Sequence, residues 1–129
     1  MAKIILVADR PESDRRLAAI LAGYELVLVR TLAEARRALR GASFDLVLVG
    51  VHFDESRMFD LMRELAEGTK IVCVRSQHFQ SHAISLEGLE IAAKALGCAL
   101  FLDLTWYADD ATGNGAVRKL LDALLSPAP

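Results

Sequence analysis

The chain has few cysteines and no pattern of them. Cys73 and Cys98 are its only two cysteines in 129 residues, too few for the disulfide framework that stabilises small secreted domains. Neither has a Cys or His neighbour at the spacing of a zinc site. Both lie in apolar segments, so we expect two buried thiols that act as small hydrophobic side chains.

Long apolar runs and glycine-rich loops are also missing. The chain starts Met-Ala-Lys and continues with Ile4–Val7, a run too short for a signal peptide or a membrane span. We therefore expect a cytoplasmic protein.

Neither G-x-G-x-x-G nor G-x-x-x-x-G-K-[ST] occurs, which removes the main support for a dinucleotide site or a P-loop. No Ser-His-Asp arrangement can be assembled either, so we expect no enzyme activity and no cofactor.

Histidine is scarce as well. His78 and His82 are four residues apart and would share one face of a helix, but their segment has weak helix formers and no third ligand nearby. A solvated loop is therefore favoured over a zinc site. His52 would need an activating neighbour to accept a phosphoryl group, and none is adjacent in the sequence.

The composition fits one globular domain without strong charge. Hydrophobic residues make up 53% of the chain and the formal net charge is −2, which gives no general attraction to nucleic acid or anionic lipid. We expect one domain over residues 1–126, followed by a tail or linker stub at 127–129.

Five short apolar runs alternate with segments of helical periodicity. Near-continuous Val, Ile and Leu runs are typical of strands that are buried on both faces of a parallel sheet. The alternation predicts a doubly wound α/β fold with helices on both faces of the sheet, in three layers. The runs are Ile4–Val7, Leu26–Val29, Leu46–Val49, Ile71–Val74 and Ala99–Leu102.

The helical segments carry their own start and stop signals. The first opens near Pro11–Ser13, and Thr31 with Glu34 forms a T-x-x-E capping box for the second. A fifth helix is predicted by the apolar positions between Val117 and Leu125. The earlier helices end near glycines, namely Gly23, Gly41, Gly68 and Gly97.

In such a sheet, ligands bind in the crevice beyond the carboxyl ends of the strands. The residues expected there are Asp9, Gly50, His52, Arg75, Ser76, Asp103 and Leu104. A magnesium site wants two or three carboxylates, so Asp9 would hold a metal weakly at most. We favour a turn or N-cap acceptor for Asp9. Arg75 could pair with Asp9 and fill the space of a cation, or be an exposed arginine at a strand end.

Three segments resemble the receiver domains of response regulators. They are Ile4–Pro11, Asp45–Gly50 and Gly97–Leu102, and the resemblance covers roughly residues 3–125. It implies a flavodoxin-like fold with five parallel strands in the order 2-1-3-4-5.

The resemblance also implies a phosphorylation pocket that has lost its chemistry. Carried over by position, the acidic pair falls on Ala8 and Asp9, the phosphoacceptor on Gly50, the switch hydroxyl on Arg75 (with Ser76 next to it) and the lysine on Leu104. An acyl phosphate needs a carboxylate, a cation, a hydroxyl and an ammonium group. Only Asp9 keeps the required type, which implies a degenerate, phosphorylation-independent pseudo-receiver of two-component signal transduction.

Receivers commonly bind partners through helix 4, strand 5 and helix 5, which here implies residues 86–125. We expect protein partners or a homodimer, with polar contacts from Glu90, Arg118 and Lys119 unless these only face solvent. The aromatic pair Trp106 and Tyr107 lies in a predicted loop and is a candidate anchor, although Trp106 could instead cover the sheet edge.

A second function stays open on the sequence alone. The crevice could sense a nucleotide or another anion through Arg75, Ser76, Asn114 and the helix N-termini.

Overall fold

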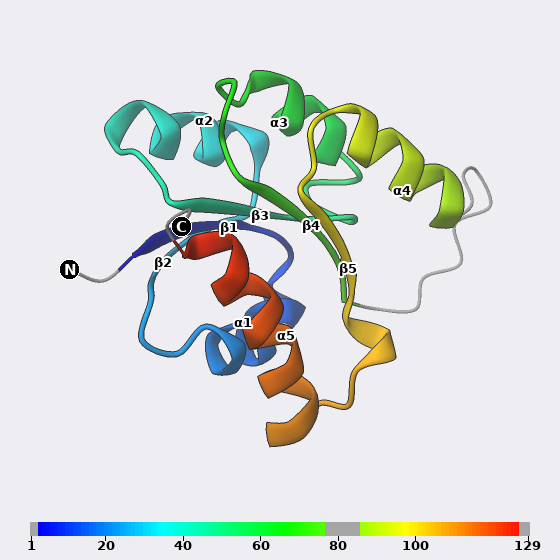
Figure 1. The fold of residues 1–129 in the computed structure, drawn as a ribbon. Helices are drawn as coiled ribbons and strands as arrows, with labels where there is room; N and C mark the ends of the chain where they lie inside the picture. Colours follow the sequence, from blue (N-terminus) through cyan, green and yellow to red (C-terminus); the bar gives the residue numbers. More distant parts are fainter. Residues whose placement is uncertain (1–2, 77–85, 127–129) are drawn as a thin grey trace.

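The computed structural model describes residues 3–76 and 86–126. Its strands form one sheet in the order β2-β1-β3-β4-β5, and all of the pairs are parallel (Figure 1). This confirms the predicted fold class and strand order. The strands are β1 Ile4–Ala8, β2 Glu25–Val29, β3 Leu46–Gly50, β4 Ile71–Arg75 and β5 Leu100–Asp103.

Helices cover both faces of the sheet. The chain also contains two short 3-10 helices, η1 at Pro11–Ser13 and η2 at Leu104–Trp106. Figure 1 shows α1 and α5 on one face and α2, α3 and α4 on the other. The helices are α1 Asp14–Ile20, α2 Leu32–Gly41, α3 Met58–Glu64, α4 Leu86–Ala95 and α5 Ala111–Leu125.

The apolar strands build two cores, because successive side chains of a strand point to opposite faces. In β3, Leu46 and Leu48 pack with α1 and α5, whereas Val47 and Val49 pack with α2, α3 and α4. All five residues of β3 are buried. The near-continuous hydrophobic runs of the sequence therefore have the predicted cause.

Side-chain caps fix the starts of two helices. The Thr31 hydroxyl accepts a hydrogen bond from the Glu34 amide at 3.1 Å, as the T-x-x-E pattern predicts. Asp54 adds a second cap, because its carboxylate accepts from the Leu32 amide at 2.8 Å. At α5, the Asp110 carboxylate accepts from the Gly113 amide at 2.8 Å.

The stretch from Thr105 to Asn114, which carries the predicted loop of Trp106 and Tyr107, is partly helical. It contains most of η2 and the first turn of α5. The Asp103 carboxylate caps η2 by accepting from the Thr105 amide, and the Asp110 cap starts α5 ahead of two glycines. Local capping thus forms helix where residue propensity is low.

Three predictions lie outside the described residues: those for His78, for His82 and for the tail at 127–129. Across 3–76 and 86–126, no helix is long and apolar enough to cross a membrane.

Candidate functional site

Asp9 lies at the carboxyl ends of the central strands. It follows β1 directly, and β3 ends beside it at Gly50. A Cβ atom built on Gly50 would lie 2.7 Å from Asp9 Oδ2 and closer still to Oδ1 and Cγ. The carboxyl group of Asp9 therefore occupies the space in which a side chain at position 50 would begin.

The Asp9 carboxyl group is buried, with only 4% of the residue exposed. Its Oδ1 accepts the Arg10 amide at 2.8 Å, as expected of a turn acceptor. Its Oδ2 accepts no hydrogen bond within the part of the chain that the structure describes. Burial raises the pKa of Asp9, and the Arg10 amide, Ser13 and the Arg30 charge offset this only in part.

Ser13 ends η1 after β1 and Ser76 follows β4, so both lie at the carboxyl ends of the strands, as Asp9 does. Their hydroxyl oxygens lie 2.7 Å apart, and Ser13 is buried. Arg30, which follows β2, adds a positive charge: its Nη1 donates to the Asp9 carbonyl at 3.1 Å, and its guanidinium pairs with Asp14. The polar groups around Asp9 thus bond mainly to one another or to the backbone.

Arg75 does not pair with Asp9, which corrects the hypothesis of a guanidinium in place of a cation. Arg75 Nη1 lies 2.8 Å from Asp103 Oδ2. The reason is the strand register, which places these two residues opposite each other on β4 and β5. Burial alone would raise the pKa of Asp103, but hydrogen bonds from Thr105 and Arg75 outweigh it, and the pKa is lowered.

Two further residues were predicted in the crevice, Leu104 and His52. Leu104 is fully buried and packs with Val117 and Leu121 in the core under α1 and α5. His52 is half-buried, and its pKa is lowered by burial and by the charges of Arg10 and Arg75. Within residues 3–76 and 86–126, no group of three His, Cys, Asp or Glu side chains could hold a metal ion.

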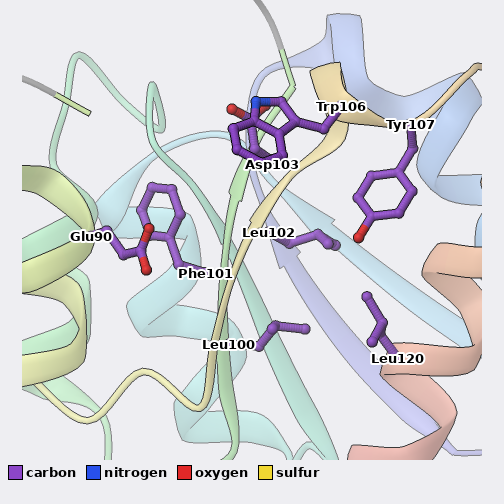
Figure 2. A pocket seen from close by; sticks show the side chains of 8 residues that line it. All are labelled: Glu90, Leu100, Phe101, Leu102, Asp103, Trp106, Tyr107 and Leu120. Carbon is purple, nitrogen blue, oxygen red and sulfur yellow. The ribbon is translucent and has the colours of Figure 1, made fainter. Parts of the chain in front are cut away.

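A groove of about 240 Å³ runs along the edge strand β5 (Figure 2). In Figure 2, Glu90 of α4 lies on one side of β5 and Leu120 of α5 on the other, with Trp106 and Tyr107 at the η2 end. Trp106 is 81% exposed, so it does not cover the core. The lining residues are Glu90, Leu100, Phe101, Leu102, Asp103, Trp106, Tyr107 and Leu120.

Arg16 of α1 holds the chain that carries the two aromatic residues. Its guanidinium donates to the carbonyls of Leu104 at 2.9 Å and Tyr107 at 2.8 Å. Its Nε donates to Asn114 Oδ1 at 3.0 Å, so the predicted anion contact Asn114 already has a partner. The role of Arg16 could not be predicted from the sequence, because the carbonyl groups that it binds are distant in the sequence and belong to the backbone, which every residue has.

The predicted polar contacts lie in different places. Glu90 lines the groove and pairs with Lys94 at 2.8 Å. Lys119 is exposed on α5, outside the groove lining. Arg118 faces α1: its Nη1 donates to the Ala22 carbonyl at 2.7 Å, and its guanidinium lies 4.4 Å from the centre of the Tyr24 ring. Arg118 therefore joins α5 to the end of α1.

Comparison with solved structures identifies the fold. A response regulator from Thermotoga maritima superposes with a TM-score of 0.74 at 18% identity, over 98% of this chain and 100% of that chain. The chemotaxis protein CheY4 from Vibrio cholerae gives 0.71 at 21% identity, over 96% and 98% of the two chains. This is the receiver fold.

A CheY-like receiver domain from Methylobacillus flagellatus agrees, with a TM-score of 0.62 at 14% identity over 96% of this chain and 98% of that chain. No protein-family model and no curated protein matches the sequence. With identities this low, the receiver fold is what the comparisons establish.

Proposed function

We propose that this chain is a receiver-like signalling module that acts through protein–protein contacts and is not switched by phosphorylation. The observation that carries the proposal is the pair Gly50 and Asp9. At position 50 there is no side chain to accept a phosphoryl group, and the space of that side chain is taken by a buried carboxyl group.

The groups around Asp9 also support a module that is not switched by phosphorylation. Phosphoryl transfer to a carboxylate depends on positioned charges that stabilise the transferring group. Here Arg75, the cation at the end of β4, is paired with Asp103. The position of the expected ammonium group is held by Leu104, which is buried in the core. We therefore propose that packed side chains fill this pocket and that it has no catalytic residue and no cofactor.

The β5 groove is the surface that we assign to a protein partner. Large, partly exposed apolar side chains at a groove concentrate binding energy at interfaces. Trp106 and Leu120 supply such side chains, and Arg16 fixes the backbone beside Trp106. A heterologous partner or a second copy of this chain would bind there. The net charge of −2 gives no reason to propose nucleic acid or a membrane as a ligand.

A small-ligand sensor is less well supported. Each expected contact already has an intramolecular partner: Arg75 bonds Asp103, Ser76 bonds Ser13, and Asn114 bonds Arg16. The N-termini of α2 and α5 are capped by Thr31 and Asp110. An incoming anion would have to displace these bonds, so we favour the protein-binding function.

Cross-linking with the purified chain as bait tests the proposal. Wild type should capture a partner, or a second copy of itself, equally well with and without acetyl phosphate and Mg²⁺. Trp106→Ala should abolish capture without lowering the thermal midpoint, because the side chain is exposed. Lys119→Ala is the control outside the groove. Capture that requires the phosphodonor, or that survives Trp106→Ala, would refute the proposal.

A further inference from the structure

β5 is an edge strand, and in the part of the chain that the structure describes it pairs with β4 alone. Along a strand, the backbone N–H and C=O groups of successive residues point alternately to the two sides. In β4, the Val74 carbonyl accepts a hydrogen bond from the amide of Val51, which follows β3 directly. The backbone groups of Cys73 and Arg75 therefore point to the other neighbour of β4, which is β5.

The register shows which backbone groups of β5 face the open edge. Cys73 lies opposite Phe101. Because the hydrogen bonds between parallel strands are slanted, Cys73 bonds to Leu100 and Leu102, the neighbours of Phe101, and not to Phe101 itself. The N–H and C=O groups of Phe101, and of Asp103 two positions on, thus point away from β4. No other segment within residues 3–76 and 86–126 pairs with them.

The β5 groove lies along this edge, and its two sides differ in chemistry. Leu100 and Leu102 pack with the core under α1 and α5, whereas Phe101 packs with the core on the α4 side. Figure 2 accordingly shows Leu102 on the side of Leu120 and Phe101 on the side of Glu90. One side of the groove is therefore apolar, and the other presents a carboxylate.

The charged side chains that line the groove, Glu90 and Asp103, are both acidic. The Asp103 side chain is 11% exposed and is held by Arg75. The Glu90 side chain is 44% exposed and pairs with Lys94 on the surface of α4, where an ion pair contributes little to stability. Glu90 can therefore exchange Lys94 for a cation of a ligand at little cost.

The volume of the groove favours an extended ligand over a helix. One helical turn is a cylinder about 10–12 Å wide and about 5.4 Å long, which is about 400–600 Å³, whereas the groove holds about 240 Å³. A helix could place only side chains in it. An extended segment can lie in the groove and bond to the backbone of Phe101 and Asp103, as in other proteins that bind peptides at a sheet edge.

We propose that the partner enters the β5 groove as an extended segment that adds a strand to β5, with lysine or arginine alternating with apolar residues. Side chains of a strand alternate between its two faces. The residues opposite Phe101 and Asp103 therefore point to the side of Glu90 and carry the positive charge. The residue opposite Leu102 points toward Leu120 and is apolar. This inference rests on the proposed function, because it names the chemistry of the partner for the same groove.

NMR spectroscopy of isotope-labelled wild-type protein tests the strand addition, with a short capped peptide of alternating lysine and valine as the probe. The peptide should protect the amide hydrogens of Phe101 and Asp103 from exchange with solvent. A matched peptide of alternating glutamate and valine should bind more weakly. The proposal is overturned by a lack of protection at millimolar peptide, by equal binding of the two peptides, or by protection of the other edge strand, β2, in place of β5.

Two N-methylated forms of the lysine peptide test the backbone bonds. In an antiparallel strand the residues opposite Phe101 and Asp103 donate the hydrogen bonds, so methyl groups on the lysine amides should abolish binding. In a parallel strand the valine amides donate instead. One of the two methylated peptides should lose binding and the other should keep it. Loss in neither peptide, or in both, would contradict strand addition.

A pair of variants on α4 tests the charge contact. Glu90→Lys should weaken binding of the lysine peptide about fivefold, the effect of an exposed ion pair. Glu87→Lys makes the same change of charge at an exposed position of α4 outside the groove lining, and it should leave the affinity nearly unchanged. An equal loss in the two variants would show that Glu90 makes no specific contact.

The outcomes separate this inference from the proposed function. If partner capture depends on Trp106 but no peptide protects the Phe101 amide, the protein-binding function stands and strand addition is wrong. If capture survives Trp106→Ala, the proposed function is wrong whatever the peptides do.

Discussion

The carboxyl group of Asp9 and a side chain at position 50 exclude each other. A Cβ atom on Gly50 would meet Cγ and both oxygens of Asp9 at 2.7 Å or less, below the closest approach of real carbon atoms. The buried conformation of Asp9 therefore requires glycine at position 50. The missing phosphoacceptor at position 50 and the buried carboxyl group of Asp9 are therefore two aspects of the same structural arrangement.

The first prediction concerns the coupling of these two residues. Gly50→Ala should destabilise the fold by about 1–3 kcal/mol, as overpacking of a core typically does, because the added methyl group forces the Asp9 carboxyl group out of its place. In an Asp9→Ala background the same change should cost far less. Urea unfolding of the four proteins in this cycle measures the coupling. An equal cost in both backgrounds would show that the two groups do not compete.

The second prediction is a pH dependence of stability. Burial raises the pKa of Asp9 in the folded state, so its contribution to stability is present below the unfolded pKa and is lost as pH rises through the folded pKa. Asp9→Asn keeps the acceptor for the Arg10 amide and removes the charge. It should stabilise the protein at neutral pH, on the order of 1 kcal/mol, and give no gain in acid below the unfolded pKa.

Thermal unfolding of wild type and Asp9→Asn across this pH range makes the comparison. Asp60→Asn, at a side chain that is 54% exposed, is the control and should change the stability by less than about 0.5 kcal/mol at any pH. A loss of stability in Asp9→Asn at neutral pH would mean that the carboxylate makes a favourable contact.

The third prediction concerns Arg16, whose side chain is 15% exposed. Arg16→Met should free the Leu104 and Tyr107 carbonyls and lower the stability by about 2 kcal/mol. Trp106 is the only tryptophan, so its fluorescence anisotropy reports on this segment, and it should decay faster in the variant. Arg37→Met, at an exposed position on α2, should leave the anisotropy unchanged. Equal anisotropy in all three proteins would mean that Arg16 does not position the segment.

The sequence predicts the fold well because its signals are local. The apolar runs, the Thr31 cap and the stop glycines each act within a few residues, and the strand order follows from the resemblance to receivers. The place of Asp9 at the crevice was also predictable, since it follows directly after β1.

Contacts between distant segments were less predictable. The sequence left Arg75 either as a partner of Asp9 or as an exposed arginine at a strand end, but the register of β4 with β5 gives it Asp103 as partner. The direction of the Asp9 side chain depends on the absence of a neighbour at Gly50, which matters only once β1 and β3 lie side by side. Arg16 binds carbonyl groups, which every residue has, so no residue type marks its role.

The most direct test of the central claim is the intact mass of the protein after incubation with acetyl phosphate and Mg²⁺. Our account predicts an unchanged mass, because position 50 has no carboxylate and Asp9 is buried. A typical phosphorylatable receiver domain is the positive control. The gain of one phosphoryl group, mapped by peptide analysis to Asp9, His52 or another residue, would contradict the account and restore phosphorylation as the switch.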